Sequence, residues 1–405
     1  MTEIQNARPK MSSPSPLFKR IKRHVIGRRQ RFFAAASPGF EAICLQELLK
    51  LQSTADHACV TPGGVEFEGR LDDCYRANLN LRLPNRILMR IGVFKASNFR
   101  QLERKAGDIP WELYLHPGSL LNVHVATRHC RLHHSGAIAE RFQRLVADGP
   151  PQIEPGEKIR NAPARNQSLY VRGADDFFTV SIDSSGDLLY KRGLKKHTGK
   201  APLRETIAAA ALRLAGYEGG QPLLDPLCGA GTFSLEAALM AKRIPPGWFR
   251  DFAFTQWPSF LAKRWNYIRG QSESGFVNPA RPLIFASDID RQACRKLQRC
   301  VEKYSLSDAV EVHQKNFFDL DPRKHTDRRG VICINPPYGR RMGAKPEPEE
   351  FFYAICDKLK KDYRHWKVVL IVPGRKLTHA VPFQTKSYPI SHGGLKLALL
   401  VGKIK

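Results

Sequence analysis

The amino-acid sequence predicts an α/β fold in which a mostly parallel sheet follows a smaller mixed unit. After Gly220, short apolar strands alternate with helical segments, as in parallel sheets covered on both faces. Before residue 190, strand-like and helical runs also occur, but in a less regular order. Near the C-terminus, two strand-like runs flank His392-Gly393-Gly394, which predicts an antiparallel hairpin. The 405 residues suffice for two or three domains.

Residues 1–30 are predicted to form a basic disordered arm. Their cations are Lys10, Lys19, Arg20, Lys22, Arg23, Arg28 and Arg29. They lack the apolar core of a secretory signal. A transit peptide is the alternative, and Glu3 together with the absence of a clean amphipathic pattern disfavours it.

Residues 31–190 are predicted to form a mixed α+β unit with an antiparallel sheet. A strand over 31–36 precedes a turn at Ser37-Pro38-Gly39 and an amphipathic helix over 40–51. Further strands are predicted over 120–125 and 177–182, with a helix over 138–146. Residues 149–165 are rich in proline and polar side chains, which predicts an exposed loop.

Residues 191–405 are predicted to form the parallel sheet. Pro202 opens an Ala-rich helix through Leu214, at an early position where its missing N–H costs nothing. Strands are predicted over 222–227, 283–288, 310–316, 331–335 and 368–372, with helices after at least the first, second and fourth. The closing hairpin is predicted over 386–391 and 396–401.

The charge of the chain favours a polyanionic partner. Lys plus Arg number 65 against 38 Asp plus Glu, a formal net charge of +27. Such a charge attracts nucleic acid, although a solubility charge or an acidic membrane surface is the alternative. The sequence contains no apolar run long enough to span a bilayer. Nine scattered cysteines without a Cys-x-x-Cys pair favour a reducing cytoplasm and disfavour a structural metal site.

The segment Asp225-Pro226-Leu227-Cys228-Gly229-Ala230-Gly231-Thr232 is the candidate cofactor loop. It follows the first strand of the parallel sheet and leads into a helix, so its glycines let the backbone approach a ligand. A simple tight turn is the alternative. The segment lacks the full dinucleotide fingerprint, and no Gly-Lys-Ser/Thr follows as in a phosphate-binding loop.

Asp288 and Ile289 end the second strand of the parallel sheet. A carboxylate at this point is suited to bind a ribose diol, and we expect Asp288 to do so with Ile289 against an adenine face. The alternative is that Asp288 or Asp290 merely caps the next helix.

The segment Asn335-Pro336-Pro337-Tyr338 is the most specific in the chain, because a buried strand ends abruptly in it. The two prolines fix the backbone and leave carbonyl groups unpaired. The Asn335 side-chain oxygen and the Pro336 carbonyl can together accept both hydrogens of an amino group. Tyr338 offers a flat face on which a base can stack. A plain turn is the alternative.

With these motifs in this order, the chain resembles the Rossmann-like class I methyltransferases, and Asn-Pro-Pro-Tyr resembles the subset that methylates exocyclic or amide nitrogens. That subset includes adenine-N6 DNA, glutamine-N5 protein and guanine-N2 RNA enzymes. Segments at 131–138, 181–187, 191–193 and 201–205 are similar to the THUMP-domain RNA methyltransferases, nearest to the bacterial guanine-N2 enzymes of 23S ribosomal RNA. The similarity runs from about residue 31 to the C-terminus and includes the insertion around 244–254.

This resemblance implies an N-terminal THUMP-type RNA-binding domain, S-adenosylmethionine as cofactor and guanine-N2 methylation of RNA without a metal. The residues it implies as cofactor contacts are Asp225, Pro226, Cys228, Gly229, Gly231, Thr232, Asp288, Ile289, Asn316 and Asn335. Asn316 departs from the family, where Asp is commoner, but its oxygen can still accept from an adenine amine. The target base is expected at Asn335 to Tyr338. Some of these enzymes carry a second, fused methyltransferase half, which this sequence does not contain.

Basic residues are candidates for contact with RNA phosphates, although each alone is more often a solvated charge. The candidates, with one histidine, are Arg128, Arg131, His134, Lys191, Arg192, Lys195 and Lys196. The RNA is expected to be 23S ribosomal RNA. A guanine-N2 methyltransferase of tRNA and a non-catalytic RNA-binding assembly factor remain open alternatives. The oligomeric state is not predicted.

Overall fold

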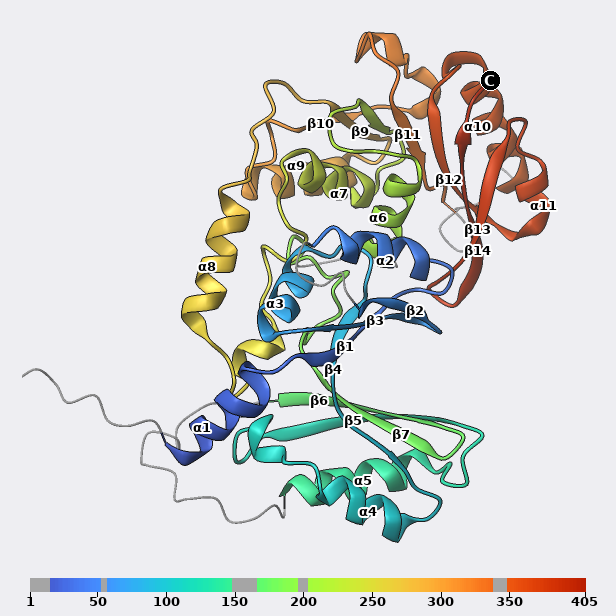
Figure 1. The fold of residues 1–405 in the computed structure, drawn as a ribbon. Coiled ribbons are helices and arrows are strands. Elements are labelled where there is room, and N and C mark those ends of the chain that lie inside the picture. The colour runs from blue at the N-terminus through green and yellow to red at the C-terminus, as the bar shows by residue number, and fades with distance from the viewer. Residues whose placement is uncertain (1–14, 52–56, 148–165, 196–202, 338–347) are drawn as a thin grey trace, which may run out of the picture.

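The part of the chain that the structure describes folds around two mixed sheets of seven strands each, one in the upper and one in the lower part of Figure 1. The computed structural model describes residues 15–51, 57–147, 166–195, 203–337 and 348–405. The predicted loop over 149–165 lies outside these residues. None of the described helices is long and apolar enough to cross a membrane.

The first sheet is built by residues 30–183, as the mixed α/β prediction required. Its strands are β1 (Gln30–Ala35), β2 (Cys59–Thr61), β3 (Gly64–Gly69), β4 (Arg86–Lys95), β5 (Leu120–Arg128), β6 (Asn166–Ala174) and β7 (Phe177–Asp183), in the order β2-β3-β1-β4-β7-β6-β5. The pair β5–β6 is parallel and the other pairs are antiparallel. The expected strands at 31–36, 120–125 and 177–182 are therefore confirmed.

Four helices pack on one face of the first sheet. They are α2 (Glu41–Leu49), α3 (Leu71–Asn80), α4 (Phe99–Gly107) and α5 (Ser135–Ala147). Across neighbouring strands, Phe32 pairs with Met89, Met89 with Ile182, and Ile182 with Leu169, so these side chains share one face. All four belong to the hydrophobic clusters that also contain buried residues of the helices. The opposite face therefore carries the alternate residues of each strand.

The second sheet has the predicted mostly parallel topology. Its strands are β8 (Leu223–Asp225), β9 (Ile284–Asp288), β10 (Val310–Gln314), β11 (Val331–Ile334), β12 (Lys367–Pro373), β13 (Thr385–His392) and β14 (Leu395–Lys403), in the order β10-β9-β8-β11-β12-β14-β13. The strands from β10 to β12 are parallel. β14 is antiparallel to β12 and β13, which confirms the closing hairpin.

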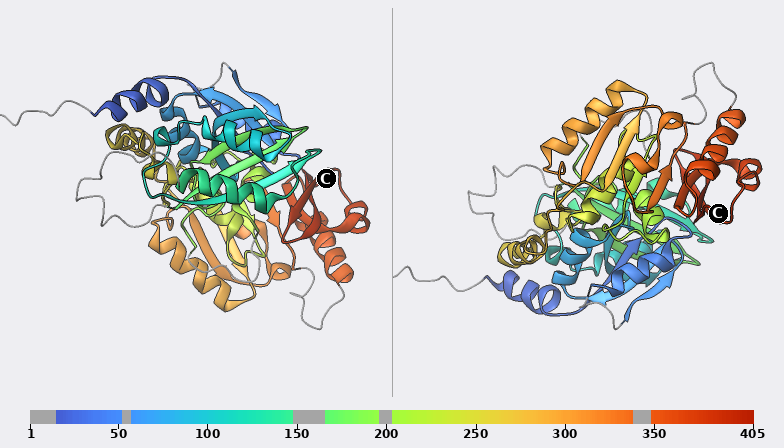
Figure 2. Two further views of the ribbon diagram at one scale, coloured as in Figure 1. Left: turned by 90° about the horizontal axis from the view of Figure 1, so that it is seen from below. Right: turned by 90° about the horizontal axis from the view of Figure 1, so that it is seen from above.

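Helices lie on the second sheet or beside it (Figure 2). They are α6 (Glu205–Leu214), α7 (Thr232–Ala241), α9 (Arg291–Lys303), α10 (Pro348–Asp362) and α11 (Gly374–His379). The helix α8 (Ala262–Glu273) instead packs on α3. The helix predicted from Pro202 begins three residues later than expected. Arg204 is still extended, and Glu205 is the first helical residue, where its negative charge suits the helix N-terminus.

The N-terminal arm also differs from its predicted structure. Residues 16–26, which we expected to be disordered, form helix α1 (Pro16–Ile21) and the π-helical segment η1 (Lys22–Ile26). Ile21, Val25 and Ile26 are buried in the main hydrophobic cluster. The burial of these three apolar side chains outweighs the local density of positive charge.

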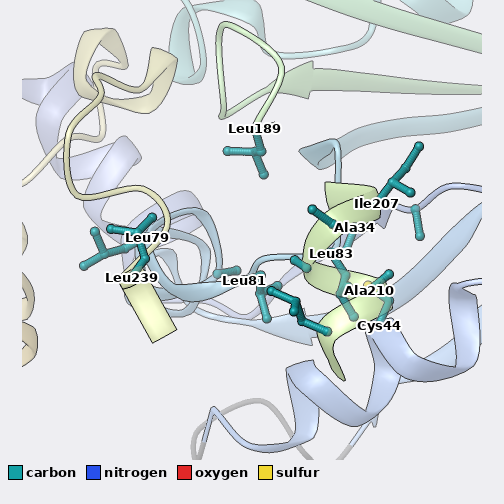
Figure 3. Close-up of a cluster of buried hydrophobic side chains, with 14 of the residues drawn as sticks. Ala34, Cys44, Leu79, Leu81, Leu83, Leu189, Ile207, Ala210 and Leu239 are labelled. Atoms are coloured by element: carbon teal, nitrogen blue, oxygen red, sulfur yellow. The ribbon is translucent and has the colours of Figure 1, made fainter. Parts of the chain in front are cut away.

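The largest hydrophobic cluster joins the two sheets. Figure 3 shows Ala34 of β1 and Leu83, in the loop after α3, close to Ile207 and Ala210 of α6. It also shows Leu79 of α3 beside Leu239 of α7. The insertion between α7 and β9 adds aromatic contacts, because Tyr75 of α3 lies 4.5 Å from the Phe254 ring and 6.1 Å from the Trp265 ring between centroids. The two parts of the chain therefore share one continuous core.

Candidate active site

The candidate site lies where three parallel strands of the second sheet end. β8 pairs with β9 on one side and with β11 on the other. The sheet then continues to β10 beyond β9 and to β12 beyond β11. The strands after β8 are therefore added first on one side of it and then on the other. Ligands of open parallel sheets bind at such a switch point, outside the carboxyl ends of the strands. The topology therefore gathers the glycine loop, Asp288 and Asn335 at one edge of the sheet.

The glycine loop is a tight turn with two glycines in a backbone conformation that other residues rarely adopt. Gly229 and Gly231 have φ of 49° and 69°, in the left-handed region that favours glycine. A Cβ atom on Gly231 would lie 2.3 Å from Cδ1 of Leu297 in α9. At Gly229, by contrast, no described atom lies within 4 Å of the corresponding position. The loop thus packs tightly on α9 at Gly231 and presents open backbone at Gly229, where a cofactor fits.

Asp288 faces this loop. Its Oδ2 accepts a hydrogen bond from the Gly229 N–H at 2.8 Å, and its Oδ1 accepts one from Asp290 N at 2.9 Å. The side chain of Asp290, not that of Asp288, caps α9 by accepting from Gln292 N at 2.8 Å. Ile289 between them is 67% exposed. A half-buried carboxylate and an exposed apolar side chain therefore flank the open part of the loop, an arrangement that fits a ribose and an adenine ring.

Asp225 is enclosed behind the loop. It is 1% exposed, and its Oδ2 accepts hydrogen bonds from Ser234 N at 3.2 Å and Ser234 Oγ at 2.7 Å. Burial raises the pKa of Asp225 to about 6, although both bonds from Ser234 oppose this shift. Asp225 therefore ties β8 to α7. The residue Ser234 was missed at the sequence level, although it is a polar residue in an otherwise apolar helix.

Three more loop residues are largely buried. Pro226 is buried, Cys228 is 7% exposed and Thr232 is 6% exposed. The Thr232 hydroxyl accepts a hydrogen bond from Lys195 Nζ at 2.8 Å. The neighbouring Cys228 thiol lowers the pKa of Cys294 in α9. The side chains of Pro226, Cys228 and Thr232 therefore shape the loop from inside, and a ligand can reach the loop backbone.

Asn316 follows β10 and begins a short 3₁₀ turn, η6 (Phe317–Asp319). Its Oδ1 accepts a hydrogen bond from Phe318 N at 3.1 Å. An amide oxygen has two lone pairs, so one remains to accept from an adenine amine. Asn316 is half-buried, and its strand β10 lies beside β9, which ends in Asp288.

Asn335 directly follows β11, whose four residues are all buried. Its Oδ1 is buried and accepts no hydrogen bond from any residue that the structure describes. A buried polar atom without a partner costs free energy, so its place at a ligand edge of the sheet points to a ligand donor. Pro336 is buried and Pro337 is half-buried. Tyr338 lies outside the described residues.

Two of the expected RNA contacts are not on the surface. Arg192 is 3% exposed, and its Nε donates to Glu236 at 2.8 Å. Lys195 has a side chain 10% exposed, paired with Glu205 at 3.1 Å. Our expectation of surface cations was therefore wrong at these positions, because buried carboxylates compensate both charges. The sequence did not reveal these partners, which lie 44 and 10 residues away along the chain.

The other expected RNA contacts are divided between exposed and undescribed positions. Arg128 is exposed at the end of β5. The Arg131 side chain is 77% exposed, and the His134 ring lies 4.2 Å from the His133 ring between centroids, inclined by 39°. Lys191 is exposed and pairs with Asp187 at 2.9 Å. Lys196 lies outside the described residues.

Two family models match the chain. Residues 192–391 match the model described as "RMKL-like, methyltransferase domain", and residues 31–88 match the one described as "RlmL ferredoxin-like domain". The first match contains the glycine loop, Asp288 and Asn335. The second covers β1 to the start of β4.

Whole proteins are also similar to this chain. Protein slr0064 of Synechocystis sp., named as a candidate RNA methyltransferase, is 32% identical over 373 residues, or 91% of this chain and 95% of that protein. The ribosomal RNA large subunit methyltransferase K/L of Methylococcus capsulatus is 30% identical over 375 residues, or 90% of this chain and 50% of the relative. The chain thus spans about half the length of the K/L relatives.

A solved structure has the same fold over nearly the whole chain. The crystal structure of SMU.472, named as a candidate methyltransferase and complexed with SAH, matches with a TM-score of 0.81 at 26% sequence identity. The match covers 93% of this chain and 99% of that protein. Both sheets are therefore included in the similarity.

Proposed function

We infer the function from one premise: the chain belongs to the family of RMKL-like methyltransferases that carry an N-terminal RlmL ferredoxin-like domain. It is an S-adenosylmethionine-dependent methyltransferase that acts on RNA. We propose that the acceptor is the exocyclic N2 of a guanosine and that the substrate is 23S ribosomal RNA. Support for the ribosomal substrate comes from the K/L relatives, of which this chain spans about half.

The buried, unpartnered Oδ1 of Asn335 carries the proposal for the reaction. An exocyclic amino group has two hydrogens, and Asn335 Oδ1 with the Pro336 carbonyl provides two acceptors for them. Accepting both hydrogens holds the amino group in place and leaves its nitrogen lone pair available to an electrophile. These acceptors also stabilise the positive charge that develops on the nitrogen.

The remaining residues of the site bind and orient. When bound, S-adenosylmethionine supplies a methyl group that is already electrophilic because it is attached to a sulfonium. Gly229, Asp288, Ile289 and Asn316 are the residues proposed to hold it. Alignment of the reacting groups, rather than a strong base, then lowers the barrier by several kcal/mol. Tyr338 is proposed to stack on the target base. A paired guanine must first be flipped out of its duplex to enter the site, at a cost of a few kcal/mol.

The proposed division of labour follows the order of the chain. Residues 31–190 are proposed to bind RNA, and residues 191–405 to bind the cofactor and the target base. The net charge of +27 supports RNA as partner. A cytoplasmic location is part of this proposal, supported by the free thiol state of the nine cysteines.

Replacement of Asn335 tests the reaction. We expect Asn335→Ala to reduce methyl transfer at least a hundredfold, or about 3 kcal/mol, because a transition-state acceptor is lost. Affinity for RNA, measured by calorimetry, should stay close to wild type. Asn80→Ala, at the half-buried end of α3, is the matched control and should methylate normally. A normal rate for Asn335→Ala would refute the assignment.

The modified base identifies the substrate. Total RNA methylated by the wild-type chain with labelled cofactor is digested and mapped by mass spectrometry. N2-methylguanosine in 23S ribosomal RNA is expected. The same base found in tRNA alone would replace the ribosomal substrate by tRNA. Failure of the wild-type chain to bind S-adenosylmethionine would leave a non-catalytic RNA-binding factor.

A further inference from the structure

The face of the first sheet that the helices do not cover carries a continuous stack of three side chains. By strand register, His124 of β5 pairs with Tyr170 of β6, and β6 is separated from β4 by β7. The His124 and Tyr170 rings are 4.6 Å apart between centroids and inclined by 20°. On the other side, the Arg86 guanidinium of β4 lies 5.1 Å from the Tyr170 centroid. A cation, a phenol and an imidazole, each from a different strand, are thus aligned.

This stack is fixed at one end and open at the other. Arg86 is held by an ion pair with the fully buried Asp183 and by a hydrogen bond of 2.6 Å to the Gly186 carbonyl. Tyr170 is half-buried between its two neighbours. His124 is exposed and lies on β5, the edge strand of the described sheet. The outer face of its ring therefore ends the stack at the sheet edge.

Two arginines share this face with His124. Residues 124, 126 and 128 alternate onto one side of β5, and residues 170 and 172 onto the same side of β6. Arg128 and Arg172 are both exposed. Arg172 pairs with Ala126, which lies between His124 and Arg128 on this side of β5. Arg172 donates one long bond, of 3.5 Å, to the Pro62 carbonyl, which leaves further N–H groups of its guanidinium to bind a phosphate.

The charge state of the ring suits stacking. Burial and the nearby Arg86 lower the pKa of His124, so the imidazole is neutral near neutral pH. The His124 ring at the end of this cation–π stack is flat and neutral, so a base can stack on it without meeting a localised charge. The arginines beside it supply the positive charge that a backbone of phosphates requires.

We propose that this edge of the first sheet, made of His124, Arg128 and Arg172, binds a single-stranded segment of the RNA substrate. An unpaired base stacks on the open face of His124 and extends the Arg86–Tyr170–His124 stack by one member, while Arg128 and Arg172 bind the flanking phosphates. The inference rests on the proposed function for its partner. Single-stranded rather than duplex RNA is the fit, because a paired base does not expose its flat face to a side chain.

The test uses the full-length protein and a short fluorescent single-stranded oligoribonucleotide, with anisotropy as readout. His124→Ala should weaken binding by about tenfold, since stacking on one side chain contributes roughly 1–3 kcal/mol per base. His124→Phe keeps a flat ring and should bind within about twofold of wild type. Arg172→Ala should lower the slope of log affinity against log salt by about 0.7, the value for one phosphate contact on a single strand.

Arg144→Ala is the matched control. Arg144 lies on α5, on the helix-covered side of the same unit, with a side chain 62% exposed and paired with Glu140. Its replacement should change neither the affinity nor the salt slope. Wild-type affinity in His124→Ala, or equal affinity of the wild-type chain for a duplex of the same sequence, would overturn the proposal.

The outcomes separate this inference from the proposed function. If the wild-type chain methylates RNA and His124→Ala binds the oligonucleotide normally, the surface is wrong and the enzyme assignment stands. If the wild-type chain transfers no methyl group to RNA but His124→Ala loses oligonucleotide binding and His124→Phe restores it, the surface stands and the enzyme assignment fails.

Discussion

At the scale of single residues, Asp225 is a carboxyl group that the fold holds in an apolar place. Its folded pKa of about 6 lies above the ordinary value of 3.8, because burial disfavours the charged form. The folded state therefore retains a proton that the unfolded chain releases. The resulting contribution to stability is fully present below about pH 4 and is lost as the pH rises through about 6.

Asp225→Asn should remove this pH dependence. An amide can still accept from Ser234 and never ionises, so the variant should gain stability relative to wild type between about pH 4 and pH 7. The relative gain in the free energy of unfolding is at most about 3 kcal/mol. Urea unfolding of both proteins across this range measures it. Parallel stability curves for the two proteins would contradict the expected shift.

Two independent features of the structure disfavour a side chain at Gly231. Its φ of 69° is strained for alanine, and the added Cβ would collide with Leu297. We expect Gly231→Ala to lower the free energy of unfolding by about 2 kcal/mol or more and to weaken binding of S-adenosylmethionine. Gly270→Ala is the control, since Gly270 lies inside α8 with no described atom within 4 Å of the new Cβ. That variant should be neutral or slightly more stable.

At the scale of elements, the parallel strands of the second sheet were predictable, whereas the first helix was not. β8, β9 and β11 are buried runs that lead into Asp225, Asp288 and Asn335, so pattern and position agree. In residues 16–26 the many cations dominate the composition and conceal an apolar face. Ile21 and Val25 are four residues apart, which is a helical spacing. This spacing marks a buried helix face only when the core that covers the helix is known, and the residues of that core lie far along the chain.

The N-terminal helix should therefore contribute to stability. Val25 is completely buried, so Val25→Ala should lower the free energy of unfolding by about 2 kcal/mol. Arg23, two residues away, is exposed, and Arg23→Ala should leave stability unchanged. Thermal unfolding followed by circular dichroism compares the two. Equal midpoints would mean that the segment does not pack on the core in solution.

At the scale of the whole molecule, the motifs of the candidate site were visible in the sequence and the joint between the two sheets was not. Asn335 and the glycine loop are local signals. The burial of Arg192 depends on Glu236, which also receives Arg82 from the first part of the chain. A local pattern cannot distinguish such an arginine from a surface cation. The surface cations expected to contact RNA were therefore the least predictable part of the candidate site.

Glu236 should be the most sensitive residue of this joint. It is 1% exposed and compensates two arginines, Arg82 at 3.4 Å and Arg192 at 2.8 Å. Removing one partner of a buried ion pair leaves an uncompensated charge, so Glu236→Ala should cost about 3–5 kcal/mol of unfolding free energy. The exposed Glu302→Ala in α9 is the control and should cost less than about 0.5 kcal/mol. Denaturant unfolding tests both, and similar small losses would show that the joint does not depend on this network.

The position of helix α8 has a consequence for how the protein is made. α8 follows β8 and α7 in the chain, yet it packs on α3 of the first sheet, and Arg264 of α8 pairs with Asp72 of α3 at 3.2 Å. A ribosome that adds about 5–20 residues per second needs roughly 5–20 s to proceed from the end of β7 to the end of α8. During that interval the surface around Tyr75 is complete but uncovered. The nascent chain therefore presents an apolar face to chaperones before its own insertion closes over it.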